Sequence, residues 1–204
     1  MIPHDEMLIP WLRERLAAHV PAHAADHPDY AGAKPAAVLI PFVLRPDGPT
    51  LLLTERSAHL PTHAGQISFP GGRIEAGDGS VDAAALRESR EEIGLDAARV
   101  TLVGQLGSYS TISGYRVTPV VGVVDPTGLA LRPDPGEVAS VFELPAWPLL
   151  QPSGYERRWI ERRGVRGKSH FIECEGRTVW GATAGMLLML AAALGIDGKP
   201  VDVD

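Results

Sequence analysis

Three glutamates lie close together near the middle of the sequence, at Glu88, Glu91 and Glu92. On a helix, which turns by roughly 100° per residue, their side chains fall within one arc of about 100°. Val81 and Ala85 project onto the same arc, so we expect the acidic face to be turned inward; the alternative is a solvated acidic surface. Like charges three and four residues apart destabilise a helix by roughly 0.2–0.5 kcal/mol per pair, and a cation bound between them would reverse this cost. The pattern predicts a site for Mg²⁺, with Mn²⁺ as a substitute, because both ions prefer carboxylate oxygens.

The element that positions these glutamates is predicted to be a helix over residues 81–93. Ser80 is suited to cap its first turn, and Gly94 is suited to end it in a left-handed conformation. A glycine-rich segment precedes the helix over residues 65–79 and contains a short strand at 67–69. The acidic helix therefore follows directly on a glycine-rich loop.

The remaining segments predict an α+β fold with a mixed β-sheet. Turn residues at 45–49 predict a hairpin of the strand-like runs at 36–44 and 50–55, and a second hairpin is predicted for the runs at 155–161 and 168–173. The strand-like runs are grouped together rather than alternating regularly with helices. A strongly apolar run at 183–194 predicts a final helix that faces the core or a second copy of the chain. The predicted strands cover residues 36–44, 50–55, 100–109, 115–124, 137–144, 155–161 and 168–173, and a first helix covers residues 7–20.

Composition narrows the possible classes of function. The 204 residues fit one generous domain. The net charge of -6 argues against broad nucleic-acid binding, which relies on a basic surface. Cys174 is the single cysteine, so neither an intrachain disulfide nor a cysteine-based zinc site is available. The N-terminus lacks the pattern of a signal peptide, and no apolar run is long enough to span a bilayer, so we expect a soluble, cytoplasmic protein.

The acidic helix and its glycine loop together resemble a known motif, the Nudix box, G-x5-E-x7-R-E-U-x-E-E-x-G-U, in which U is aliphatic. The matching residues are Gly72, Arg87-Glu88, Glu91-Glu92, Gly94 and Leu95. This chain has one residue more than the pattern between Gly72 and Arg87, and it carries Ser89 at an aliphatic position. Asp78 or Glu75 takes the place of the early glutamate. The resemblance implies the Nudix fold, in which a mixed β-sheet is sandwiched between helices.

The resemblance also implies roles for individual residues. Glu88 and Glu92 hold a metal ion, and Glu91 joins them or acts as the general base. A backbone carbonyl at the Gly72 turn adds a ligand, and Arg87 orients Glu91 across one helical turn. The implied reaction is hydrolysis of a diphosphate, in which metal ions screen the phosphate charge and acidify an attacking water, so that no covalent nucleophile is needed.

A second motif lies immediately upstream. Residues 52–72, LLTERSAHLPTHAGQISFPGG, resemble the signature L-L-T-x-R-[SA]-x3-R-x3-G-x3-F-P-G-G of the coenzyme A pyrophosphatase branch of Nudix hydrolases, with Pro61 in place of the second arginine. Arginine is suited to bidentate contact with phosphate. The alternative to a substrate contact is, for Arg56, an ion pair with the neighbouring Glu55. For His59 and His63, the alternative is a structural role in a turn. The expected substrate contacts are Arg56, Arg73, His59 and His63.

Two loops provide further candidates. Glu137 follows an Asp-Pro-Gly turn, where Nudix proteins often carry a loop glutamate that assists catalysis; the alternative is a structural hydrogen bond. Tyr109 and Tyr115 flank a Ser/Thr/Gly loop over residues 110–114. This loop either covers the site or serves only cross-strand packing.

Together, the two motifs predict Mg²⁺-dependent hydrolysis of coenzyme A and its derivatives to adenosine 3′,5′-bisphosphate and 4′-phosphopantetheine. The alternatives are the same chemistry on ADP-ribose or a dinucleotide, a non-catalytic nucleotide-binding module, and an isomerase. We expect a small-molecule substrate, no nucleic-acid or membrane partner, and a homodimer as one option. The predicted organisation is a helix and connector over residues 1–34, a Nudix hydrolase domain over 35–196 and a tail over 197–204.

Overall fold

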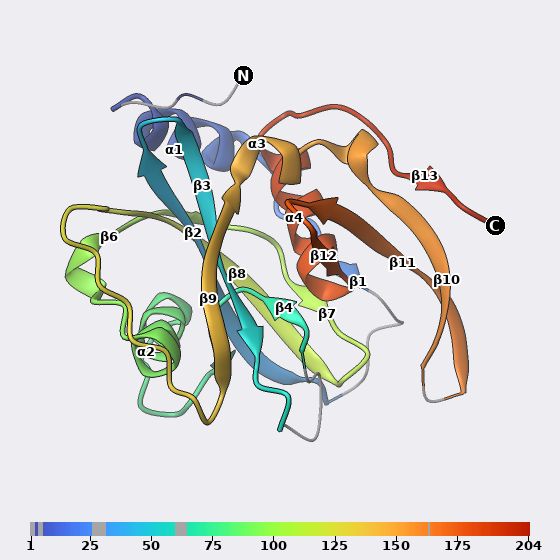
Figure 1. Ribbon diagram of the computed structural model, residues 1–204, viewed down its shortest axis with the longest axis horizontal. Helices are drawn as coiled ribbons and strands as arrows, with labels where there is room; N and C mark the ends of the chain where they lie inside the picture. Colours follow the sequence, from blue (N-terminus) through green and yellow to red (C-terminus); the bar gives the residue numbers. More distant parts are fainter. Residues whose placement is uncertain (1–2, 4–5, 26–31, 60–64, 163) are drawn as a thin grey trace.

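A central mixed β-sheet lies between helices, and a second, smaller sheet flanks it (Figure 1). This computed structural model describes residues 3, 6–25, 32–59, 65–162 and 164–204. The predicted α+β fold with a mixed sheet between helices is confirmed. The helices are α1 (Leu8–Ala18), α2 (Val81–Ile93), α3 (Ala146–Leu149) and α4 (Ala182–Ala193), with short 3₁₀ turns at Ala97–Arg99 and Pro152–Gly154. The strands are β1 (Ala24–Ala25), β2 (Lys34–Arg45), β3 (Gly48–Arg56), β4 (Ile67–Ser68), β5 (Gly71–Arg73), β6 (Val100–Gln105), β7 (Tyr109–Ser110), β8 (Tyr115–Val124), β9 (Val138–Pro145), β10 (Glu156–Arg162), β11 (Val165–Cys174), β12 (Arg177–Trp180) and β13 (Val201–Asp202).

The central sheet is organised around β2 and β8. These strands run parallel from the pair Lys34 and Tyr115 to the pair Val43 and Val124. The chain between them crosses over through α2, as neighbouring parallel strands require. Strand β3 forms the predicted hairpin with β2, and β9 runs antiparallel to β3. In the described part of the chain, no helix combines the length and apolarity needed to cross a membrane.

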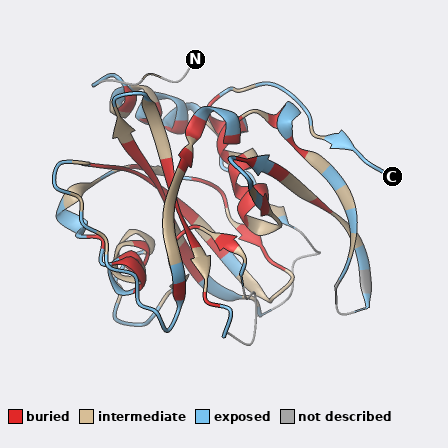
Figure 2. Ribbon diagram, viewed as in Figure 1, coloured by how far each residue is buried: buried red, intermediate tan, exposed pale blue. Residues whose placement is uncertain are grey.

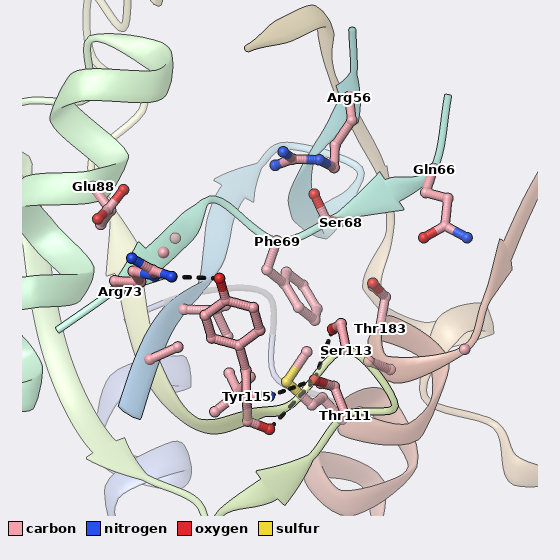
Figure 3. Close-up of a pocket in the computed structure, with 18 of the residues that line it drawn as sticks. Arg56, Gln66, Ser68, Phe69, Arg73, Glu88, Thr111, Ser113, Tyr115 and Thr183 are labelled. Atoms are coloured by element: carbon pink, nitrogen blue, oxygen red, sulfur yellow. Dashed lines mark hydrogen bonds between the residues drawn. The ribbon is translucent and has the colours of Figure 1, made fainter. Parts of the chain in front are cut away.

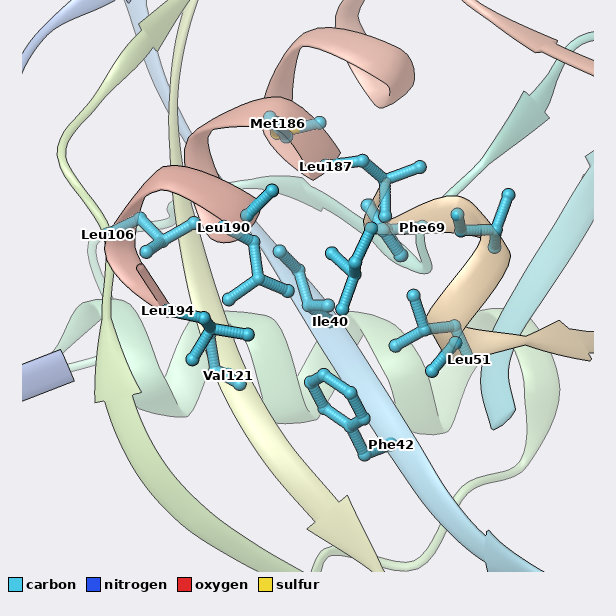
Figure 4. Close-up of a cluster of buried hydrophobic side chains, with 14 of the residues drawn as sticks. Ile40, Phe42, Leu51, Phe69, Leu106, Val121, Met186, Leu187, Leu190 and Leu194 are labelled. Atoms are coloured by element: carbon cyan, nitrogen blue, oxygen red, sulfur yellow. The ribbon is translucent and has the colours of Figure 1, made fainter. Parts of the chain in front are cut away.

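Alternating side chains of β2 build two cores, one on each face of the sheet, because successive residues of a strand point in opposite directions. Leu39 and Val43 belong to the core under α2, whereas Ile40 and Phe42 belong to the core under α4. All four are fully buried (Figure 2), and Figure 4 shows Ile40 facing Leu190 of α4. Each such side chain stabilises the fold by roughly 1.5–3 kcal/mol. The alternation thereby fixes α2 on one face of the sheet.

The N-terminal helix α1 packs on the same core as α4. Leu8, Leu12 and Leu16 are spaced one helical turn apart and are buried. Leu16 lies over Gly104 of β6, where an added Cβ would come within 3.1 Å of its side chain. The domain limits at residues 35 and 196 stay a prediction. Helix α1 lies before the first limit in the chain, and its leucines pack in the core.

The strand predicted over residues 100–109 is divided into β6 and β7. Gly107 lies between them, and the Ala22 backbone approaches it so closely that an added Cβ would overlap the Ala22 carbonyl oxygen. Strand β1 continues this contact by pairing in parallel with β7. The division therefore results from a long-range contact with the N-terminal segment, which no local pattern indicates.

The second sheet has the order β12-β11-β10-β13. The hairpin of β10 and β11 was predicted, but β12 was not. Glu175 and Gly176 join β11 to β12 with φ angles of 49° and 73°, as a two-residue hairpin turn requires. Phe171 and Trp180 stack across these strands with ring centres 5.4 Å apart. This hairpin returns the chain toward the start of α4.

Helix α2 begins and ends where the sequence predicts. Ser80 Oγ accepts a hydrogen bond from the Ala83 N–H at 3.1 Å. Gly94 ends the helix with a φ angle of 68°, and its N–H donates to the Arg90 carbonyl at 2.9 Å. The two caps set which residues of the segment are helical, and therefore which face carries the acids.

We expect Ser80→Ala to lower the free energy of unfolding by about 1 kcal/mol, because it removes the acceptor for a first-turn N–H. Urea unfolding at pH 7 followed by circular dichroism measures this change. Ser153→Ala, at an exposed serine, is the matched control and should behave as the wild type. Equal midpoints for all three proteins would show that the cap contributes nothing.

Candidate active site

A cavity of about 570 Å³ lies where the two sequence motifs meet. Its wall is formed by β4 and β5, one face of α2, the loop between β7 and β8, and the start of α4 (Figure 3). Glu88 and Glu92 of α2 line it, together with Arg56 and Phe69 from the upstream segment. Side chains far apart in the sequence therefore line one cavity.

Arg87 joins the glycine loop to the acidic helix. Its guanidinium donates to both carboxylate oxygens of Asp78, at 2.6 and 3.0 Å, and to the Arg73 carbonyl at 2.9 Å. On its other side it contacts Glu91 at 2.9 Å and Glu88 at 3.0 Å. The hydrogen bonds from Arg87 hold the pKa of Asp78 below its usual range. Asp78 is thus the residue that pairs with Arg87, at the position of the early glutamate of the motif.

Glu92 is buried, with 6% of its side chain exposed. Its carboxylate accepts a hydrogen bond from the Gly71 N–H at 3.0 Å and lies 3.9 Å from the Arg56 guanidinium. Burial raises the pKa of Glu92 to about 7, and the charges of Glu137 and Glu88 add to this effect, while Gly71 and Arg56 oppose it. A carboxylate whose ionised form is disfavoured in this way gains from a nearby cation.

Glu88 lies directly against the backbone of Gly72. A Cβ added at Gly72 would be 2.6 Å from the Glu88 carboxyl carbon, so any other residue would displace the carboxylate. Burial raises the pKa of Glu88, the charges of Glu91 and Glu137 act in the same direction, and Arg87 acts against them. Glycine at position 72 therefore keeps a carboxylate at the edge of the cavity.

Glu88 and Glu92, with Gly72 beside them, fit a hard divalent cation such as Mg²⁺. Both carboxylates line the cavity, and both have raised pKa values that an adjacent cation would lower. In the part of the chain that the structure describes, no three His, Cys, Asp or Glu side chains are already gathered for a metal ion. Mg²⁺ commonly binds through one or two carboxylates, waters and substrate phosphates, so this pair is a sufficient protein contribution.

Glu91 does not share the inward orientation predicted for the three glutamates. Its side chain is 60% exposed and is held by Arg87, and it is not among the residues that line the cavity. Ser89 occupies the buried side of the helix instead, where its hydroxyl donates to the Ala85 carbonyl at 2.7 Å. The prediction was wrong because the arc of about 100° spans both the edge and the centre of the buried face.

Most of the other predicted site residues lie at the cavity, but His59 does not. Arg56, Arg73 and Glu137 line it. His59 is exposed and is not among the lining residues. His63 lies outside the described residues, as does Pro61 of the upstream signature.

For the wall opposite α2, the sequence indicated only the loop over residues 110–114, as one of two alternatives, and it did not indicate the contribution of α4. Thr111 and Ser113 of the β7–β8 loop, Tyr115 at the start of β8 and Thr183 of α4 line the cavity. Tyr115 also accepts a hydrogen bond from Arg73 Nε at 3.2 Å, as Figure 3 shows. The Ser/Thr/Gly composition of the loop was the one available signal, and it fits surface turns equally well.

Comparison with known proteins gives a consistent assignment. The family model described as NUDIX domain matches residues 33–160. "Uncharacterized Nudix hydrolase NudL" of Photorhabdus laumondii is 44% identical over 156 residues, which cover 76% of this chain and 82% of that protein. The protein of the same name from Escherichia coli O1:K1 / APEC is 45% identical over 161 residues, 79% of this chain and 83% of its own. Among solved structures, the Nudix hydrolase RenU from M. smegmatis aligns with a TM-score of 0.46 and 24% identity over 58% of this chain and 74% of that chain.

The raised pKa of Glu92 predicts how the metal-free protein responds to pH. An acid whose pKa rises from 4.5 to about 7 on folding costs the folded state nothing below pH 4.5 and progressively more as pH rises through 7. At about 1.4 kcal/mol per pKa unit, the cost at pH 8 is on the order of 3 kcal/mol. We therefore expect Glu92→Gln to have a higher Tm than the wild type at pH 8 in EDTA, and a similar Tm at pH 4.

Calorimetric unfolding at both pH values measures the difference between the two proteins. Glu91→Gln, at the exposed neighbouring glutamate, is the matched control and should gain little at pH 8. Added Mg²⁺ should raise the Tm of the wild type more than that of Glu92→Gln. A Glu92→Gln protein that is no more stable than the wild type at pH 8 would contradict this account of the buried carboxylate.

Proposed function

This chain belongs to the NUDIX domain family, and we propose that it hydrolyses the pyrophosphate bond of coenzyme A and its derivatives to adenosine 3′,5′-bisphosphate and 4′-phosphopantetheine. The observation that carries the proposal is the position of the upstream motif. Arg56, Phe69 and Gly71 of that motif line the same cavity as Glu88 and Glu92. The residues that resemble a coenzyme A signature therefore adjoin the proposed metal site.

The charges around the cavity suit a substrate with several phosphates. Arg56 and Arg73 line the cavity on the side of the acidic helix. Arginine binds phosphate oxygens in a bidentate manner, and its guanidinium stays charged at all relevant pH values. Arg73 Nε donates a hydrogen bond to the Tyr115 hydroxyl. This hydrogen bond fixes the orientation of the guanidinium and therefore of its terminal nitrogens. Two such cations offset the charge of a diphosphate near Glu88 and Glu92.

Glu88 and Glu92, assisted by the backbone at Gly72, would hold the divalent cation. When bound, the cation neutralises phosphate oxygens and lowers the pKa of an attacking water. The residues of the chain then have separate tasks. Arg87 holds Glu88 against the glycine loop, and the Gly71 N–H fixes one oxygen of Glu92. Both carboxylates are oriented before any ligand arrives.

Glu137 is our candidate for the group that removes a proton from the attacking water. It lines the cavity, and its charge raises the pKa of both Glu88 and Glu92, so it lies near them. Its backbone carbonyl accepts a hydrogen bond from the Ser57 N–H at 2.8 Å, which ties its loop to β3. Glu91, the other candidate, is engaged by Arg87 away from the cavity. The position of Glu137 therefore suits general-base chemistry better.

The substrate proposal is tested by incubating the purified protein with coenzyme A, ADP-ribose or NADH, in Mg²⁺ or in EDTA, and following products by mass spectrometry. We expect turnover of coenzyme A that depends on Mg²⁺ and yields the two products named above. Turnover of ADP-ribose but not of coenzyme A would replace the proposed substrate. Absence of metal-dependent turnover of all three would reject the proposed activity.

Glu137→Gln is expected to lower kcat by about 100-fold or more, because it removes the proton acceptor while preserving side-chain shape. KM for coenzyme A should change little, since the arginines that bind phosphate are untouched. Glu91→Gln is the comparison variant and should lower kcat much less. The reverse order of the two effects would assign the base to Glu91.

A further inference from the structure

The cavity has two chemically different ends. Figure 3 shows Glu88 and Arg73 on one side of Phe69, and Thr111, Ser113 and Thr183 on the other. The first side adjoins the proposed metal site and carries the charged lining residues described above. The second is formed by the β7–β8 loop and the start of α4, and its lining residues are uncharged. We call it the neutral end and define it by Thr111, Ile112, Ser113, Thr183 and Met186.

Hydroxyl and aliphatic groups alternate at the neutral end. Thr111 Oγ1 and Ser113 Oγ lie within hydrogen-bond distance of each other at 2.9 Å, and Ile112 lies between them in the chain. Thr183 donates its hydroxyl to the Ile67 carbonyl at 2.9 Å, which leaves its oxygen lone pairs as acceptors. Met186 adds a flexible apolar surface. A flexible chain that carries amide groups between short alkyl segments matches this alternation.

Two aromatic rings near the cavity already have partners. The Trp180 ring is stacked on Phe171, and the Arg73 guanidinium lies 5.7 Å from the centre of the Tyr115 ring. A purine base that entered the neutral end would therefore find one face of each ring already occupied. Its ribose 3′-phosphate would also have to lie among uncharged groups, where an unpaired anion is costly. Both considerations direct the nucleotide half of the substrate away from the neutral end.

We propose that the neutral end binds the pantetheine arm of the substrate, while the adenosine 3′-phosphate arm lies on the side of Arg56 and Arg73. This assignment rests on the proposed function, because only a substrate with one charged and one neutral arm has halves to be sorted in this way. The diphosphate between the arms then lies beside Glu88 and Glu92. The β7–β8 loop accordingly determines which molecules with a diphosphate are accepted.

The test measures binding of the two product halves separately, by titration calorimetry in Mg²⁺, so that it does not depend on turnover. Ile112 is partly exposed, so it can be replaced without emptying the core. Ile112→Asp places a charge at the neutral end, and Ile112→Asn provides the same shape without the charge. We expect Ile112→Asp to weaken binding of 4′-phosphopantetheine by about 10-fold or more, and Ile112→Asn to weaken it much less. Binding of adenosine 3′,5′-bisphosphate should stay within about twofold of the wild type in both variants.

The other outcomes overturn the assignment. Selective loss of adenosine 3′,5′-bisphosphate binding in Ile112→Asp would place the nucleotide arm at the neutral end. Loss of both ligands, or of neither, would show that this end does not sort the arms. The wild-type hydrolysis assay distinguishes these results from failure of the proposed function, because coenzyme A turnover is measured there without any change at Ile112.

Discussion

The guanidinium of Arg87 binds two stretches of chain at the same time, Asp78 and the Arg73 carbonyl in the glycine loop and Glu88 and Glu91 on α2. Without it, the loop would be joined to the helix by the hydrogen bond from the Gly71 N–H to Glu92 and by the Ser80 cap. With it, the backbone of Gly72 is held against Glu88. The hydrogen bond from Arg87 to the Arg73 carbonyl also fixes the backbone from which the Arg73 side chain extends. A planar cation with five donors can make these contacts together, whereas lysine cannot.

The same arrangement concentrates acids at a place where ionisation is unfavourable. Burial and mutual repulsion raise the pKa values of Glu88 and Glu92, and only part of this effect is offset by Arg87, Arg56 and the Gly71 N–H. The packing of α2 on the sheet supplies the free energy that holds these groups in place. A site with this imbalance favours a divalent cation, since the cation relieves the repulsion that folding creates.

The proposed sorting of the two substrate arms involves elements other than the acidic helix. Strand β1 pairs with β7 just before the loop that lines the neutral end, and Thr183 ties α4 to β4. The hairpin of β11 and β12 returns the chain to that helix. The shape of the cavity thus depends on both terminal regions, while its charge depends on residues 56–92 and on Glu137.

Local patterns were sufficient for the caps of α2 and for the β2–β3 hairpin, because each depends on neighbours along the chain. The mixed-sheet fold was predicted from the grouping of the strands and from the motif resemblance. Local patterns also placed Glu88, Glu92, Arg56 and Arg73 in one motif region. The exposure of Glu91, the exposed position of His59, the division of β6 from β7 and the neutral end were decided by tertiary structure alone. The physical reason is the same in each case: burial and orientation depend on which distant segment packs against a residue, and helical periodicity or a motif spacing carries no information about that segment.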